Sequence, residues 1–343
     1  MAPALTGAIF LCAGAQRILF FDKDRGAEIF VRACGGNYLA LENGSPTGFN
    51  PFQCERNEAN TQFLAELIKV LGGKAEYSAR EEEDIYRAVE GMLDTPMHLR
   101  SMSNFRKSLP NMGDDGLYAR LRRWTAGNSL GWVFDNPVDT IDLTRASIIG
   151  FDYTDVIDNA EVRVPVINYL LHRLEALIDG RPLIYVMDEF WKILDGKGGL
   201  KEFAKNKQKT IRKQNGLGIF ATQSPEDALA SDIVAALIEQ TATMILLPNP
   251  NASRDDYMEG LKLTDAEYQV VVSLRSHPIL TKATRSVRKS NEYVCTSAPK
   301  ECHAARLTPL VGGRVGCQQW PGRGVHVADT MVARGRHLSD LSA

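Results

Sequence analysis

The sequence lacks an excess of charge of either sign, a long hydrophobic run and any close pair of cysteines. A formal net charge of −2 over 343 residues gives the surface as a whole no attraction to nucleic acid or anionic lipid. No apolar run approaches the ~20 residues that span a bilayer, and the longest, residues 4–15, has no preceding Lys or Arg to open a secretory signal. The six cysteines include no CxxC pair, which argues against a zinc ribbon or a disulfide scaffold and indicates a reducing compartment.

What is present is the composition of an ordinary globular protein, with 44% hydrophobic and 24% charged residues. Short apolar runs alternate with longer helical patterns, which is typical of a parallel sheet with crossover helices. The predicted fold class is therefore α/β with a mainly parallel sheet. The predicted strands are residues 17–22, 38–41, 146–151, 183–187, 217–222 and 243–247.

Helical patterns occupy the stretches between these strands. Residues 155–179 carry apolar side chains at helical spacing and predict one long amphipathic helix, which Gly180 is placed to end. From about residue 57 to 130 the chain is helical and charged, and we interpret it as an insertion into the α/β core. Its acidic run, residues 81–84, predicts a helix start, because carboxylates there complement the helix dipole.

The main candidate for a catalytic site is residues 182–189, where an apolar strand ends in Asp188 and Glu189. P-loop NTPases build a Walker B site in this way. The first carboxylate faces the Mg²⁺ of bound ATP, and the next polarises the water that attacks the γ-phosphate. The alternative is an acidic residue that merely caps the following helix, as at the ends of many buried parallel strands.

Several segments extend this pattern into a series: residues 20–26, 182–192, 210–216 and 220–228, with residues 247–250 after the last strand. Together they resemble the C-terminal RecA-like motor domain of the VirB/TrbE/CagE family, the ATPases of type IV secretion and conjugation, over about residues 15–275. The resemblance implies a RecA-like P-loop NTPase core with a helical insertion, and ATP and Mg²⁺ as cofactors. It also implies a homo-hexameric ring, intact motor subunits and other type IV secretion components as partners, and a place at the cytoplasmic face of the inner membrane.

The predicted catalytic residues are Glu189, Gln223 and Arg212. Gln223 follows an apolar strand, so its amide could orient water or sense the γ-phosphate; a plain turn residue is the alternative. Arg212 lies in a basic stretch that otherwise predicts a solvated helix face, and in a ring it could approach a neighbouring subunit's nucleotide. Asp188 and Asp22 are the predicted cofactor-binding residues, with Asp188 also the Mg²⁺ ligand through ATP.

The glycine loop that should cradle the phosphates is missing from the sequence. The pattern GxxxxGK[ST] does not occur, and Gly72-Gly73-Lys74 lacks both the upstream glycine and the following hydroxyl. We therefore expect a chain truncated before residue 1, without its Walker A loop, that neither binds ATP tightly nor hydrolyses it. Whether such a chain is an enzyme is left open by the sequence.

Four segments are predicted: 1–56 as the first part of the RecA-like core, 57–130 as the helical insertion, 131–275 as the core with Walker B and sensor motifs, and 276–343 as an atypical tail. The tail loses apolar periodicity and is interpreted as disordered or frameshifted. The predicted function is a truncated, inactive copy of a type IV secretion motor ATPase. The alternatives are a non-catalytic subunit of such a ring and a fragment of an FtsK-like DNA translocase; DNA binding is left undecided.

Overall fold

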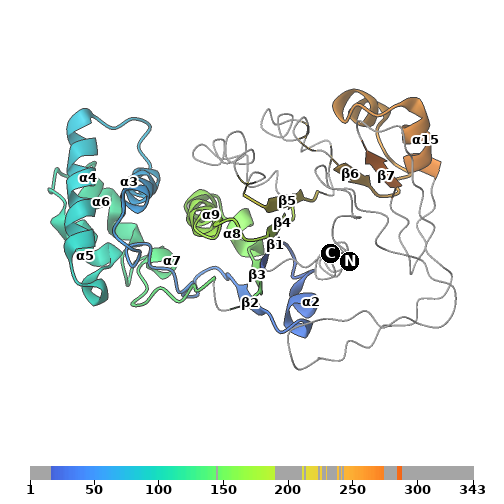
Figure 1. Ribbon diagram of the computed structural model, residues 1–343. Helices are drawn as coiled ribbons and strands as arrows, with labels where there is room; N and C mark the ends of the chain where they lie inside the picture. Colours follow the sequence, from blue (N-terminus) through green and yellow to red (C-terminus); the bar gives the residue numbers. More distant parts are fainter. Residues whose placement is uncertain are drawn as a thin grey trace. The chain divides into compact units, whose positions relative to one another are not determined.

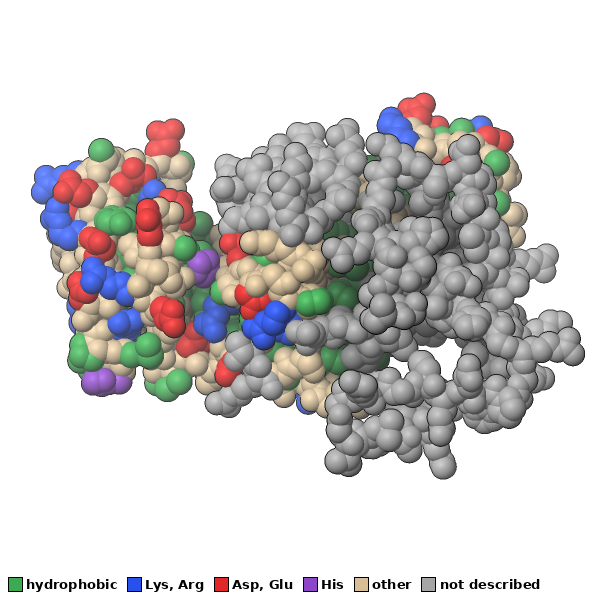
Figure 2. All heavy atoms as spheres, in the orientation of Figure 1, with side chains coloured by type: hydrophobic (Ala, Val, Ile, Leu, Met, Phe, Trp, Pro, Cys, Tyr) green, Lys and Arg blue, Asp and Glu red, His purple; other side chains and the backbone are tan. Residues whose placement is uncertain are grey.

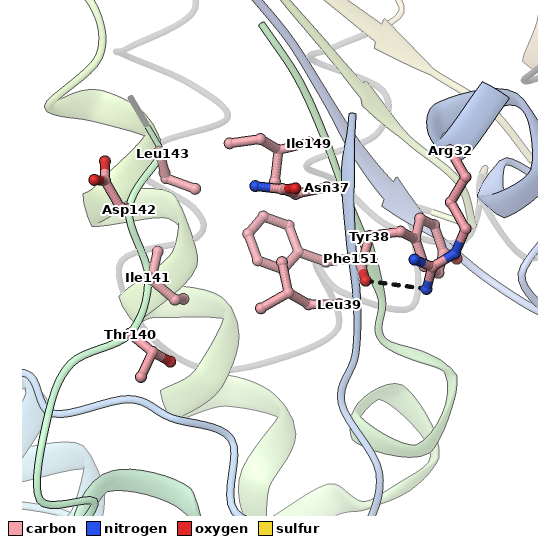
Figure 3. Close-up of a pocket in the computed structure, with 10 residues that line it drawn as sticks. All are labelled: Arg32, Asn37, Tyr38, Leu39, Thr140, Ile141, Asp142, Leu143, Ile149 and Phe151. Atoms are coloured by element: carbon pink, nitrogen blue, oxygen red, sulfur yellow. Dashed lines mark hydrogen bonds between the residues drawn. The ribbon is translucent and has the colours of Figure 1, made fainter. Parts of the chain in front are cut away.

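The computed structural model describes residues 17–143, 146–189, 211, 214–222, 225, 229, 238, 241 and 243–273, and the backbone of 284–287. The chain divides into two compact units, Met1–Leu237 and Ile238–Ala343, which are described separately. Figure 1 shows the helices and strands of both. None of the helices in the described ranges is long and apolar enough to cross a membrane.

A five-stranded sheet forms the centre of the first unit. Its order is β2-β3-β1-β4-β5, and every neighbouring pair is parallel. The strands are β1 (Arg17–Asp22), β2 (Asn37–Ala40), β3 (Ile148–Asp152), β4 (Leu183–Met187) and β5 (Gly216–Phe220). All five lie within two residues of their predicted bounds, so the predicted α/β class is confirmed.

Strands β1, β3 and β4 are buried along their whole length, as expected for central strands covered on both faces. On one face, alternate side chains such as Ile18, Ile148 and Val186 form a core with Val31 of α2 (Glu28–Ala33). Helices α8 (Thr154–Asp158) and α9 (Ala160–Glu175) lie on the side of the sheet away from α2 (Figure 1). The sheet is thus the middle layer of three.

The prediction of one helix over residues 155–179 is wrong. The structure has two helices, α8 and α9, separated at Asn159. The Asn159 side chain accepts a hydrogen bond from the backbone N–H of Glu161 and caps α9. The apolar periodicity runs through this break, since Val156 before it and Val166 after it are both fully buried. Capping, which the periodicity does not report, ends the first helix and starts the second.

A helical lobe, residues 58–134, lies between β2 and β3 in sequence and to the left of the sheet in Figure 1. It comprises α3 (Glu58–Gly72), α4 (Ala79–Asp94), η1 (Met97–Leu99), α5 (Met102–Ser108), α6 (Leu117–Arg120), η2 (Leu121–Trp124) and α7 (Gly131–Phe134). Helix α4 begins at the predicted acidic run with a capping box between Ser78 and Glu81. The predicted domain boundaries themselves remain predictions.

Two segments between the lobe and the sheet, residues 41–57 and 135–143, run side by side. The N–H of Thr140 donates to the carbonyl of Gly48 at 2.8 Å, and the Asn50 amide donates to the carbonyl of Asn136 at 2.8 Å. Helix α3 also packs on α9, where Phe63 stacks on His172 with ring centroids 3.9 Å apart. The lobe is therefore held to the sheet layer at more than one place.

The second unit contains an antiparallel pair, β6 (Thr243–Leu246) and β7 (Thr284–Val287), a π-helical turn (Asp256–Gly260) and helix α15 (Asp265–Ser273). The predicted strand at residues 243–247 is confirmed as β6. Most of the predicted tail, residues 276–343, lies outside the described residues.

Candidate functional site

Acidic residues end three neighbouring strands of the parallel sheet. Asp22 ends β1 and pairs in register with Asp152, which ends β3, while Asp188 and Glu189 directly follow β4. We call these four residues the carboxyl edge. Parallel strands bring their carboxyl ends to the same side of a sheet, which is where ligands bind in open α/β folds. The fold therefore brings together three of the predicted site residues, Asp22, Asp188 and Glu189, and adds Asp152.

The backbone of Asp188 is fixed on both sides. Its N–H donates to the carbonyl of Phe21 at 2.9 Å, and its carbonyl accepts a hydrogen bond from the hydroxyl of Tyr153. The next residue, Glu189, is only 5% exposed and has a φ angle of 47°. A left-handed conformation costs a residue with a Cβ roughly 1–2 kcal/mol, so the surrounding structure must stabilise it here.

The electrostatics of the carboxyl edge disfavour ionisation of Asp188. Burial, followed by the charges of Glu189 and Asp22, raises the pKa of Asp188 from its ordinary value of 3.8 to about 6, although Lys23 acts in the opposite direction. Burial next to these carboxylates also raises the pKa of Tyr153 well above its usual range, so its hydroxyl keeps its proton. A divalent cation would relieve the repulsion between the carboxylates.

Asp22 is occupied by contacts within the protein. Its Oδ2 accepts hydrogen bonds from the Tyr38 hydroxyl at 2.6 Å and from the N–H of Ala27 at 2.8 Å, whereas its buried Oδ1 has no hydrogen-bond partner among the described residues. Burial raises the pKa of Asp22, and the bond from Tyr38 opposes that rise. Tyr38 can lie across β3 because residue 150 is glycine: a Cβ there would stand 2.4 Å from the tyrosine ring.

A loop of residues 22–27 closes over Asp22. Asp24 and Arg25 in this loop both have left-handed backbones, with φ angles of 60° and 56°. The Arg25 guanidinium donates to Asp152 at 2.8 Å and to Glu42 at 2.8 Å. These contacts place a cation at the carboxyl edge that neutralises Asp152.

The sequence reasoning missed Asp152, Tyr153, Tyr38 and Arg25. A signal for Asp152 existed, because it directly follows an apolar run that was predicted as a strand, as Asp188 does. Nothing in the sequence pattern pairs Tyr153 with Asp188, which lies 35 residues away. Two of the predicted catalytic residues, Gln223 and Arg212, lie outside the described residues.

The residues at the carboxyl edge fit the metal side of a nucleotide site. Within the described ranges, no group of three or more His, Cys, Asp or Glu is arranged to hold a metal ion by itself. Mg²⁺ in nucleotide sites takes one or two carboxylates and completes its shell with phosphates and water. The residues for the phosphate side do not fit, because the chain has no GxxxxGK[ST] loop. Lys23, whose charge acts on Asp188, is paired with Asp24 at 2.8 Å.

Comparison with known proteins decides the family. Residues 99–292, more than half of the chain, match the model of the TraG P-loop domain. The type IV secretion system protein VirB4 of Bartonella henselae is 45% identical over 271 residues, which cover 77% of this chain and 34% of that protein. The chain belongs to the VirB4 family. PtlC of Bordetella pertussis is 42% identical over 279 residues, covering 78% of the chain and 34% of the relative.

The VirB4 fold is also found among solved structures. VirB4 of Thermoanaerobacter pseudethanolicus matches with a TM-score of 0.65 at 18% identity, covering 87% of each chain, which supports the RecA-like P-loop NTPase fold. The chain spans about a third of the length of the curated VirB4-family relatives it matches. The predicted resemblance, fold class and type IV secretion family are therefore confirmed.

Proposed function

We propose that this chain supplies the metal-binding half of the nucleotide site of a type IV secretion motor ATPase. The observation that supports this most directly is the Asp188–Glu189 pair at the end of a fully buried parallel strand, with the Asp188 pKa raised to about 6. Carboxylates with perturbed pKa values are candidates for functional sites, and the carboxyl ends of parallel strands are where ligands bind in open α/β folds.

Each of the site residues predicted from the sequence has a proposed role. Asp188 would contact the Mg²⁺ that accompanies ATP, and Glu189 would orient the attacking water. Bound Mg²⁺ would neutralise the phosphate charge that develops on transfer. Asp22 would have a structural role at the carboxyl edge, through the hydrogen bonds that it accepts from Tyr38 and Ala27. Gln223 as a γ-phosphate sensor and Arg212 as a cation reaching a neighbouring subunit belong to the same proposal.

The longer VirB4-family protein is proposed to couple ATP hydrolysis to pilus assembly and substrate export. Its relatives are named as type IV secretion proteins. In this proposal six copies form a ring at the cytoplasmic face of the inner membrane, with other secretion components as partners. The present chain would contribute the Walker B side of each site and the helical lobe.

Binding of Mn²⁺, a spectroscopically visible substitute for Mg²⁺, tests the proposal directly. We expect the pure chain to bind Mn²⁺ weakly, with Mg²⁺ as a competitor, and the binding to be lost in Asp188→Asn. Electron paramagnetic resonance of free Mn²⁺ would give the affinity of each variant. The matched control is Asp179→Asn, because Asp179 is a more exposed carboxylate that pairs with Arg17 and Arg181 away from the carboxyl edge.

The proposal predicts that Asp179→Asn binds Mn²⁺ as the unsubstituted chain does. Equal Mn²⁺ binding by the Asp188→Asn variant and the unsubstituted chain would show that Asp188 is not the metal ligand.

A further inference from the structure

Tyr153 connects three strands at the carboxyl edge. It follows β3 and is fully buried. Its N–H donates to the carbonyl of Asp22 at the end of β1, at 3.1 Å, and its hydroxyl donates to the carbonyl of Asp188 after β4. Its ring meets that of Phe21 in β1 edge to face, with centroids 6.4 Å apart and an interplanar angle of 78°.

The Tyr153 hydroxyl donates to a carbonyl whose orientation affects the backbone of Glu189. The Asp188 carbonyl is part of the peptide unit between Asp188 and Glu189. Rotation of that unit changes ψ of Asp188 and φ of Glu189 together, since both bonds flank the same plane. The hydrogen bond from Tyr153 therefore fixes the rotation that gives Glu189 its φ angle of 47°.

We propose that Tyr153 is a positioning residue for the Asp188–Glu189 pair: its hydroxyl holds the peptide between them, so that Glu189 keeps its left-handed backbone and its buried place at the carboxyl edge. The bond restrains a conformation that an L-residue otherwise avoids. The functional consequence, a metal site of the right geometry, rests on the proposed function; the restraint on the peptide does not.

A purely structural role would need only the ring. A phenylalanine fills nearly the same volume and keeps the contact with Phe21, so packing alone predicts no effect of removing the hydroxyl on the Asp188 carbonyl. The matched control is Tyr169, which is also buried but whose hydroxyl donates to the Asp139 carboxylate at 2.5 Å, away from the carboxyl edge.

The sequence offers a direct view of this peptide, because the dipeptide Asp-Glu occurs once, at residues 188–189. Full-length chain labelled with ¹³C at the Asp carbonyl and ¹⁵N at Glu gives a single correlated amide signal, which reports the Asp188 carbonyl and the Glu189 N–H. We would record it for the unsubstituted chain, Tyr153→Phe and Tyr169→Phe, without metal and during titration with Mn²⁺.

Tyr153→Phe is expected to move the Asp188 carbonyl resonance to higher field, as loss of a hydrogen bond does, and to weaken Mn²⁺ binding about tenfold, as loss of a residue that orients a metal ligand does. Tyr169→Phe is expected to change neither. A carbonyl resonance that stays in place in Tyr153→Phe overturns the inference. So does a moved resonance with unchanged Mn²⁺ affinity, because the peptide would then not position the metal site.

The two proposals fail in different ways. If no variant binds Mn²⁺ at Asp188, the proposed function fails, and the carbonyl resonance still decides whether Tyr153 restrains the peptide. If Tyr153→Phe does not fold, replacement of Tyr153 by 4-aminophenylalanine keeps a weaker donor at the same place. The resonance should then lie partway to higher field, and a position equal to that of the unsubstituted chain overturns the inference.

Discussion

Three residues at or next to the carboxyl edge, Asp24, Arg25 and Glu189, have positive φ angles although none is glycine. Specific contacts hold Asp24 and Arg25: the N–H of Asp24 donates to the Thr154 hydroxyl at 2.8 Å, and the Arg25 guanidinium donates to Asp152. Strained backbones persist only where neighbours over-determine them, and they gather at functional sites. The concentration of strain beside the Asp188–Glu189 pair supports a site there rather than a helix cap.

Replacing Asp24 tests whether this strain is real. Asp24→Gly should raise the free energy of unfolding by a few tenths to about 1 kcal/mol, because glycine adopts a positive φ without steric cost but gains entropy in the unfolded chain. Asp24→Ala should lower it by about 0.5–1 kcal/mol, since alanine tolerates the left-handed region less well than aspartate. Urea denaturation of both variants measures this, and equal stabilities would contradict a left-handed Asp24.

The raised pKa of Asp188 predicts a pH-dependent effect of Asp188→Asn. Between pH 4 and pH 6 the folded chain binds a proton at Asp188 that the unfolded chain does not, so ionisation above pH 6 destabilises the fold. In metal-free buffer, Asp188→Asn should therefore raise the free energy of unfolding by roughly 1–2 kcal/mol above pH 6, after allowance for solvent screening. The gain should vanish below about pH 4.

Glu81→Gln is the control of opposite sign. A hydrogen bond from Lys74, with further bonds from Ser78, lowers the pKa of Glu81 from its ordinary value of 4.5 to about 2. Its ionised form stabilises the fold above pH 4.5, and that stabilisation is lost as the pH falls toward 2. Glu81→Gln should thus destabilise the chain at neutral pH. For Asp188→Asn, the contradicting result is a difference in unfolding free energy from the unsubstituted chain that stays constant from pH 4 to pH 7. That result would mean that the pKa of Asp188 is not shifted.

At the scale of helices and strands, the sequence predicted the sheet better than the helices. Strands β1 and β4 begin and end at their predicted residues, because each contains a continuous apolar run that ends at an aspartate, Asp22 or Asp188. The break at Asn159 was missed, since the apolar periodicity continues through it. The position of Asp188 and Glu189 at the end of a buried strand was predictable from the sequence. The contacts of Tyr153 and Tyr38 were not, because their hydrogen bonds join residues that only the folded sheet brings together.

The cap at Asn159 should be measurable. Asn159→Ala removes the acceptor for the Glu161 N–H at 3.1 Å and the bond to Asn43 at 3.0 Å, so unfolding should become easier by about 1 kcal/mol. Asn159→Asp keeps the capping oxygen and should retain most of the stability. Thermal denaturation followed by circular dichroism would compare them, and an alanine variant as stable as the parent would mean that α8 and α9 separate for another reason.

At the scale of the whole molecule, the chain has the carboxylates of the proposed metal site but not the GxxxxGK[ST] loop that would hold phosphates. Most of the contacts that bind a nucleotide to a P-loop protein come from the backbone N–H groups and the lysine of that loop. The helical lobe and the sheet are linked by two hydrogen-bonded connections and by the packing of α3 on α9, so the site and the lobe belong to one compact unit.

The lack of a phosphate-binding loop predicts how the pure chain behaves with ATP. In the proposed function Asp188 and Glu189 hold a cation, but without the phosphate contacts they cannot fix the γ-phosphate in line with a water. Positioning is the main source of rate in phosphoryl transfer. We expect no Mg²⁺-dependent release of phosphate above that of the Glu189→Gln variant, and no saturable binding of ATP at micromolar concentrations. Robust hydrolysis that Glu189→Gln abolishes would mean that residues outside the described ranges complete the phosphate site. If the chain has no ATPase activity of its own but co-purifies with a full-length motor protein, the result would instead favour a non-catalytic subunit of the motor ring.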